Sequence, residues 1–138
     1  MKNRSKNPFR DNGAILNKGR GFKLLTQEIR KKLPPLHAQE SEGSKAIAYL
    51  KLFAPGSSFA WYITEGLPIT DDTGNELDLE FFALVEGQFR DIYYVALSEI
   101  ERVGDSLGLP IELDLWWQPK TLEEIAPELF RSSEEVEG

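Results

Sequence analysis

The sequence predicts a single α+β domain with a mainly antiparallel, meander-like sheet of about five strands and about three short helices. Three observations predict this class. The 138 residues are enough for one core of ordinary size and too few for two. Short segments rich in β-branched and aromatic residues follow one another with turn-rich connections. N-cap residues and proline or glycine stops bound the segments with a helical pattern.

The first predicted helix lies in the stretch LLTQEIRKKLPP. Thr26 is a suitable N-cap, and Pro34 with Pro35 ends the helix, because proline disfavours helix in the residue before it. We therefore expect a helix from about Gln27 to Lys32. The polar connector HAQESEGS follows it.

The next two segments, 46–53 and 59–65, predict a β-hairpin. The first, AIAYLKLF, is apolar on both faces, as a central strand is. The second, FAWYITE, alternates between two faces. One face carries Phe59, Trp61 and Ile63, and the other carries Tyr62 and Thr64.

A turn-rich loop, GLPITDDTGN, is expected over residues 66–75, before a third strand in the sequence ELDLEFFALVEG. Alternation places one set of apolar side chains on a common face of this strand, with Asp78 and Glu80 opposite. The set is Leu77, Leu79, Phe81, Ala83 and Val85. The stretch DIYYVAL, residues 91–97, predicts a fourth strand.

The C-terminal third predicts a helix, a strand and a second helix. In SEIERVGDSLG, Ser98 and Glu101 have the spacing of a capping box, and Gly104 or Gly108 can end the helix. IELDLWW, residues 111–117, alternates as a strand does. TLEEIAPELF then predicts a short helix with Thr121 as its N-cap.

Charge divides the chain into a basic arm at 1–21, a domain at 22–130 and an acidic tail at 131–138. Residues 1–20 carry a net charge of +5 and the other 118 residues −12. An acidic body repels phosphate backbones, so direct nucleic-acid binding is disfavoured except through the arm. We interpret the arm as a flexible, solvated tail, and the alternative is that it concentrates the positive charge that nucleic-acid binding requires.

Composition also narrows the compartment and the cofactors. There is no cysteine, which excludes disulfides and thiolate chemistry and fits a cytoplasmic protein. No apolar run approaches the roughly 20 residues that cross a bilayer, so no membrane association is expected. We assign no catalytic residue, cofactor or metal ligand.

The reactive side chains are few. His37 is the only histidine, so a metal site with two imidazoles is excluded, and we interpret it as an ordinary surface or partly packed residue. Four acids near the predicted hairpin could together bind Mg²⁺ or Ca²⁺: Asp71, Asp72, Asp78 and Glu80. Because no lysine follows them in DLEFF, we interpret them as solvated charges and keep a metal-dependent enzyme acting on nucleic acid as an alternative.

Each of four predicted strands carries two adjacent aromatic residues. The pairs are Trp61-Tyr62, Phe81-Phe82, Tyr93-Tyr94 and Trp116-Trp117. Adjacent strand residues point to opposite faces, so one ring of each pair should enter the core. By alternation with Leu113 and Leu115, Trp117 is the core candidate and Trp116 faces outward beside Glu112 and Asp114. The alternative is that the C-terminal helix covers the second face.

An outward aromatic row with acidic neighbours favours a protein partner, because sheets that stack nucleic-acid bases pair their rings with basic residues. The candidate partner-binding residues are Trp116, Tyr62, Glu112, Asp114, Asp71, Asp72, Asp78 and Glu80.

Several motifs in order resemble one bacterial family: KKLPPL, KLFAPGSSFAWYITEG, EFFALVEG and LSEIERVGDSLGLPIELDLWWQP. The chain resembles domain of unknown function 2958 over roughly residues 24–125. The resemblance implies a small accessory protein of a plasmid, phage or integrated element. Leu113 and Gln118 replace an arginine and a lysine common in the family, which removes positive charge.

We therefore expect a non-enzymatic binding or adaptor protein of a bacterial mobile element, acting through an aromatic and acidic surface. The alternative within the binding class is an acidic DNA mimic that inhibits a nuclease, a restriction enzyme or a CRISPR-type defence enzyme.

Overall fold

The structure is a computed structural model that describes residues 25–131. The basic arm expected at 1–21 lies outside the described residues, as does all of the expected acidic tail except Arg131. In the described part, the helices are too short or too polar to span a membrane.

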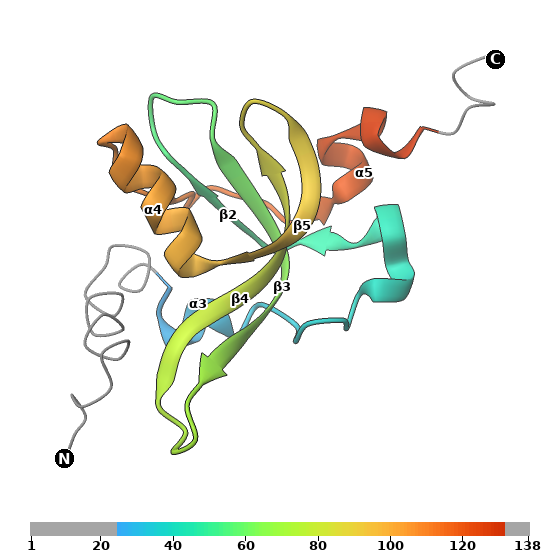
Figure 1. Cartoon of the computed structure of the whole chain (residues 1–138). Coiled ribbons are helices and arrows are strands. Elements are labelled where there is room, and N and C mark those ends of the chain that lie inside the picture. The colour runs from blue at the N-terminus through green and yellow to red at the C-terminus, as the bar shows by residue number, and fades with distance from the viewer. Residues whose placement is uncertain (1–24, 132–138) are drawn as a thin grey trace.

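The main sheet has five antiparallel strands in the order β5-β4-β3-β2-β6 (Figure 1). The strands are β2 (Leu50–Phe53), β3 (Ala60–Thr70), β4 (Glu76–Glu86), β5 (Arg90–Ala96) and β6 (Glu112–Leu113). Strands β2 to β5 form a meander, and β6 returns beside β2. Two short strands, β1 (Ile47–Ala48) and β7 (Lys120–Thr121), pair separately. The predicted α+β class and five-stranded antiparallel sheet are confirmed.

The helices are short, as expected. They are α3 (Gln27–Arg30), α4 (Leu97–Leu107) and α5 (Leu122–Ile125), with two 3-10 helices, η1 (Glu40–Lys45) and η2 (Pro127–Phe130). Thr26 and Thr121 cap α3 and α5, as predicted, because each hydroxyl accepts a backbone N–H of the first turn. Gly108, with a φ of 70°, ends α4.

The predicted cap of α4 is wrong by two residues. The helix follows Ala96, whose N–H donates to the carboxylate of Glu99 at 2.7 Å. Ser98 lies inside the first turn and donates its hydroxyl to Asp78 instead. The buried carboxylate of Asp78 on β4 therefore sets the position of Ser98, and the local capping pattern does not.

The sheet separates two hydrophobic cores. The larger core lies between the first face of the sheet and helices α3 and α4, and it contains Trp61, Ile63, Phe81 and Ile100. The smaller core lies on the second face, where Tyr62 and Leu84 pack against α5 and Ala126. The predicted alternation in β3 and β4 is therefore confirmed for these side chains.

Three predicted boundaries are wrong. Half of the loop expected at 66–75 is strand, because 66–70 pairs with β4 and only 71–75 turns. The strand expected at 46–53 is split at Tyr49, which belongs to neither β1 nor β2. The strand expected at 111–117 ends at Leu113, because the Asp114 carboxylate accepts the N–H of Trp116 at 2.9 Å and closes a turn.

Candidate functional site

A β-bulge in β3 decides the direction of Glu65. Ile63 lies opposite Ala83 and Glu65 lies opposite Phe82, so Thr64 is an extra residue without its own partner on β4. Strict alternation would place Glu65 on the first face with Ile63. The bulge instead places Glu65 on the second face, with Phe82.

Glu65 is buried, with 2% of its surface exposed. Its Oε1 accepts the N–H of His37 and its Oε2 accepts the N–H of Gln39, both at 2.7 Å. His37 has a φ of 75°, a left-handed conformation that is uncommon outside glycine. The carboxylate therefore fixes a strained segment of the connector against β3.

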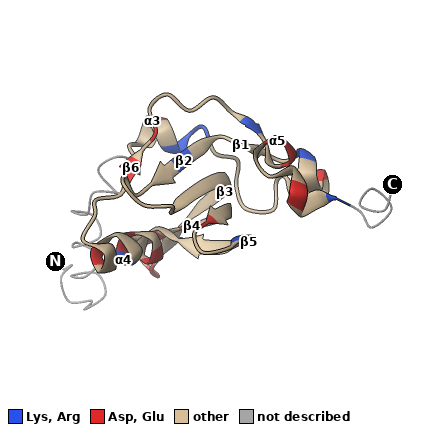
Figure 2. Cartoon of the chain, turned by 90° about the horizontal axis from the view of Figure 1, so that it is seen from above, with Lys and Arg blue, Asp and Glu red and all other residues tan. Residues whose placement is uncertain are grey.

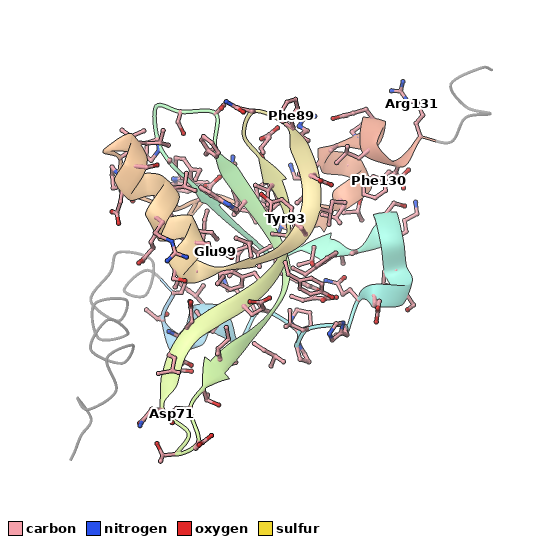
Figure 3. The ribbon with its side chains drawn as sticks, in the orientation of Figure 1. Asp71, Phe89, Tyr93, Glu99, Phe130 and Arg131 are labelled. Carbon is pink, nitrogen blue, oxygen red and sulfur yellow. The ribbon has the colours of Figure 1, made fainter. Side chains whose placement is uncertain are left out.

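Beside Glu65 lies a cavity of about 350 Å³, which we call the Glu65 cavity. Its walls come from the connector and η1, from β3, β4 and β5, and from the C-terminal segment. The residues that matter below are His37, Glu40, Glu65, Phe82, Tyr94 and Phe130. Figure 3 shows Phe130 on η2, at the C-terminal side of the sheet. Segments far apart in sequence thus build one concavity on the second face.

Aromatic side chains form one side of the Glu65 cavity. The ring centroids of Phe82 and Tyr94 are 4.8 Å apart, with the rings tilted by 54°. The hydroxyl of Tyr94 lies 3.2 Å from Nδ1 of His37, within hydrogen-bond distance. Tyr94 is 44% exposed on the edge strand β5, so the aromatic wall is accessible from outside.

The electrostatic environment of the cavity is negative. The pKa of Tyr94 is raised above its usual value, first by desolvation and then by the charges of Glu40, Glu65 and Glu80. The pKa of Glu80 is itself raised, by desolvation and then by Glu99 and Asp78. Among the described residues that line the cavity, none is lysine or arginine. The site suits a cationic ligand better than an anionic one.

Residues 24–126 match the model of one protein family, described as "Protein of unknown function (DUF2958)". The chain belongs to this family. No curated protein and no solved structure matches the chain. The match covers every residue named at the Glu65 cavity except Phe130, so the core of this site lies within the DUF2958 region.

Two candidate residues of this DUF2958 protein were expected at the surface and are buried. Tyr62 lies beneath Trp117, with ring centroids 5.3 Å apart, and its hydroxyl donates to Glu86 at 3.0 Å. The carboxylate of Asp78 accepts the Ser98 hydroxyl at 2.5 Å and its N–H at 3.1 Å. The expected exposure is wrong for both, because the C-terminal segment covers Tyr62 and the first turn of α4 covers Asp78.

Burial of Tyr62 gives a testable pH dependence. Desolvation, followed by the hydrogen bond and charge of Glu86, raises the pKa of Tyr62 to about 12. A phenol whose pKa is higher in the folded state stabilises the fold below its unfolded pKa, and this contribution is lost as pH rises through the folded value. We expect urea denaturation to show a loss of stability between pH 10 and about 12 that is smaller in Tyr62→Phe. Identical pH profiles of the two proteins would contradict this assignment.

The two adjacent tryptophans have different environments, as expected, but for a different reason. Trp116 is 88% exposed, whereas Trp117 packs on the second core and donates its indole N–H to the Ala48 carbonyl at 2.9 Å. Both lie in the turn after Asp114, so strand alternation does not separate them. Leu115, which alternation placed in the core with Trp117, is 78% exposed, and that prediction is wrong.

The remaining acidic candidates lie in two places, one beside Trp116 and the other in the turn between β3 and β4. Glu112 and Asp114 lie at β6 and the following turn, where Asp114 is 3.9 Å from the Lys51 ammonium. Asp71 and Asp72 belong to the turn between β3 and β4, and Figure 3 shows Asp71 at the tip of this hairpin.

The Asp71 carboxylate organises this turn. It accepts the backbone N–H groups of Thr73 and Asn75, both at 2.9 Å. Although desolvation opposes ionisation, hydrogen bonds from these two residues lower the pKa of Asp71 to about 2. Over residues 25–131, no three His, Asp or Glu side chains are arranged to hold a metal ion. The four acids considered as a metal site therefore do not form one common site in this part of the chain.

The principal residues of this candidate site were not predicted from the sequence. His37 was interpreted as ordinary, and Glu40, Glu65 and Tyr94 were not among the candidate residues. One feature of the sequence could have identified Glu65 as a candidate residue. Glu65 ends the apolar run FAWYIT, where a carboxylate on a central strand needs hydrogen-bond donors.

Proposed function

We propose that this DUF2958 protein is a non-catalytic binding module that docks a basic segment of a protein partner on the second face of its sheet. The observation that supports the proposal is the composition of the Glu65 cavity. Glu40, Glu65 and the rings of Phe82 and Tyr94 line one concavity, without a lysine or arginine among its described lining residues.

The edge of the sheet beside the cavity favours a peptide segment as the ligand. Among residues 25–131, β5 is the edge strand of the main sheet, and it carries Tyr93 and Tyr94, both exposed. A free strand edge can add a strand from a partner, and exposed tyrosines are frequent hot spots of protein interfaces. A partner strand along β5 would have its side chains within reach of the cavity.

Overall charge supports a basic partner. Residues 25–131 carry 9 Lys and Arg against 19 Asp and Glu, a net charge of −10. Figure 2 shows acidic positions on both α4 and α5, on opposite sides of the sheet. Such a field accelerates encounter with a positively charged partner.

The same charge keeps the DNA-mimic interpretation as a second candidate. A DNA mimic uses many dispersed carboxylates, so its binding should weaken steeply with salt, whereas docking of rings and a buried carboxylate should be less salt-sensitive. An origin in a mobile element remains an expectation from the family resemblance.

Photo-cross-linking tests the proposed face. With a photoreactive phenylalanine analogue at position 94 of the full chain, we expect an adduct with a host protein in a bacterial lysate. The matched control carries the analogue at Phe89, which is 82% exposed but does not line the cavity. We also expect Glu40→Gln, beside the analogue at 94, to reduce the adduct several-fold, because it removes a charge from the cavity. Equal adducts at 89 and 94 would contradict the proposal.

A further inference from the structure

Glu65 is a buried carboxylate that forms no ion pair with any residue of the described part of the chain. Within residues 25–131, none of the ion pairs involves Glu65. Two cations on elements that line the cavity have other partners: Arg90 of β5 pairs with Glu86 and Glu128, and Lys45 of η1 pairs with Glu123 at 3.1 Å. Two backbone N–H groups stabilise the Glu65 charge, and a cation brought into the cavity would gain a strong electrostatic interaction there.

The hydrogen-bonding capacity of Glu65 is only partly used. An ionised carboxylate offers about four lone-pair sites, and each Glu65 oxygen accepts one N–H in the structure. A guanidinium group has five N–H donors in a planar fork, which matches the remaining acceptor sites. An ammonium is a compact point charge without this planar geometry.

The aromatic wall provides a second recognition element. The rings of Phe82 and Tyr94 meet at 4.8 Å, and Tyr94 is accessible. A cation within about 6 Å of such a ring is attracted by its quadrupole, and a guanidinium plane also stacks on aromatic faces. Glu40, 3.7 Å from the His37 ring nitrogen, adds negative charge at the exposed side of the cavity.

The size of the cavity limits the ligand. A volume of about 350 Å³ is at the lower end of ligand sites, which range over roughly 300–1,000 Å³. It accommodates one long side chain and excludes a large cofactor. Side chains of a strand added along β5 alternate between faces, so every second one would extend over the second face with Tyr94.

We infer that the Glu65 cavity receives the guanidinium group of an arginine from the partner segment, hydrogen-bonded to Glu65 and stacked on Tyr94. The inference rests on the proposed function, because it assumes that the segment docks along β5. It assigns the buried carboxylate a recognition role in addition to its anchoring of residues 37–39.

Nuclear magnetic resonance titration of the ¹⁵N-labelled full chain tests this inference with three probes. The first is a soluble peptide with one central arginine, the second its citrulline analogue, and the third N-acetylarginine amide. Citrulline keeps the shape of arginine and removes its charge. We expect the arginine peptide to shift the amide signals of His37, Gln39 and Glu65, with a dissociation constant at least tenfold lower than that of the citrulline peptide.

Two substitutions of exposed residues at the Glu65 cavity are not expected to unfold the protein, so the test does not depend on folding. Tyr94→Leu and Glu40→Gln alter exposed side chains and keep the two hydrogen bonds by which Glu65 holds the connector backbone, and each should weaken binding of the arginine peptide at least threefold. Phe89→Ala should leave its affinity unchanged. Equal affinity for the arginine and citrulline peptides, or shifts confined to residues 112–117, would overturn the inference.

The outcomes separate the inference from the proposed function. If position 94 cross-links to a partner and citrulline binds as well as arginine, the guanidinium site is wrong and the protein-binding function stands. If N-acetylarginine amide binds the cavity as tightly as the peptide and no partner cross-links, the cavity recognises a small guanidinium compound. In that case the protein-binding function is wrong and guanidinium recognition stands.

Discussion

Replacing Glu65 with alanine is expected to lower the free energy of unfolding by about 3 kcal/mol, because it removes the acceptor of two backbone N–H groups. A buried donor without a partner costs roughly 1–3 kcal/mol, and two are affected here. Urea denaturation followed by tryptophan fluorescence measures the change. Glu65→Gln should cost less, since its amide oxygen retains one acceptor.

Glu42→Ala is the matched control for this prediction. Glu42 is an exposed acid on η1. Its replacement should change the unfolding free energy by less than about 0.5 kcal/mol, as is usual for surface positions. Hydrogen exchange adds a local measurement, because the amides of His37 and Gln39 should exchange much faster in Glu65→Ala. Unchanged stability together with unchanged exchange would refute the anchoring role of Glu65.

Trp117→Ala is expected to cost about 3 kcal/mol, whereas Trp116→Ala should change stability by less than about 0.5 kcal/mol. The Trp117 ring packs on Tyr62 at 5.3 Å, its N–H bonds to Ala48, and the ammonium of Lys120 lies 4.9 Å from its centroid. Trp117 is only partly buried, so the lower end of the range for large aromatic truncations applies.

The variant Trp117→Phe separates the contribution of ring packing on Tyr62 from that of the hydrogen bond to Ala48. It keeps an aromatic ring on Tyr62 and loses the bond to Ala48, so we expect it to cost about 1 kcal/mol, the usual net value of one hydrogen bond. Thermal and chemical denaturation of the three variants would check the order. A larger loss from Trp116→Ala than from Trp117→Ala would show that the turn after Asp114 has another conformation in solution.

Much of the fold was predictable because its signals are local. Turn residues and runs of β-forming side chains marked the strands of the meander, and the period of two placed Trp61 and Ile63 on one face and Tyr62 on the other. Thr26 and Thr121 were identified as caps because a threonine hydroxyl accepts hydrogen bonds from N–H groups in the first turn of the helix that follows it. The family resemblance was also available from the motifs and is confirmed over residues 24–126.

The sequence by itself determined the fold class and the facing of the apolar side chains in β3 and β4. Only the tertiary structure decided the candidate site, because its determinants join distant segments. The bulge at Thr64 reverses the direction of Glu65, and its partners lie 26 and 28 residues away in the connector. The C-terminal segment buries Tyr62, which has no local signal of being covered. Alternation describes one strand, whereas a bulge or a covering segment depends on contacts with the rest of the fold.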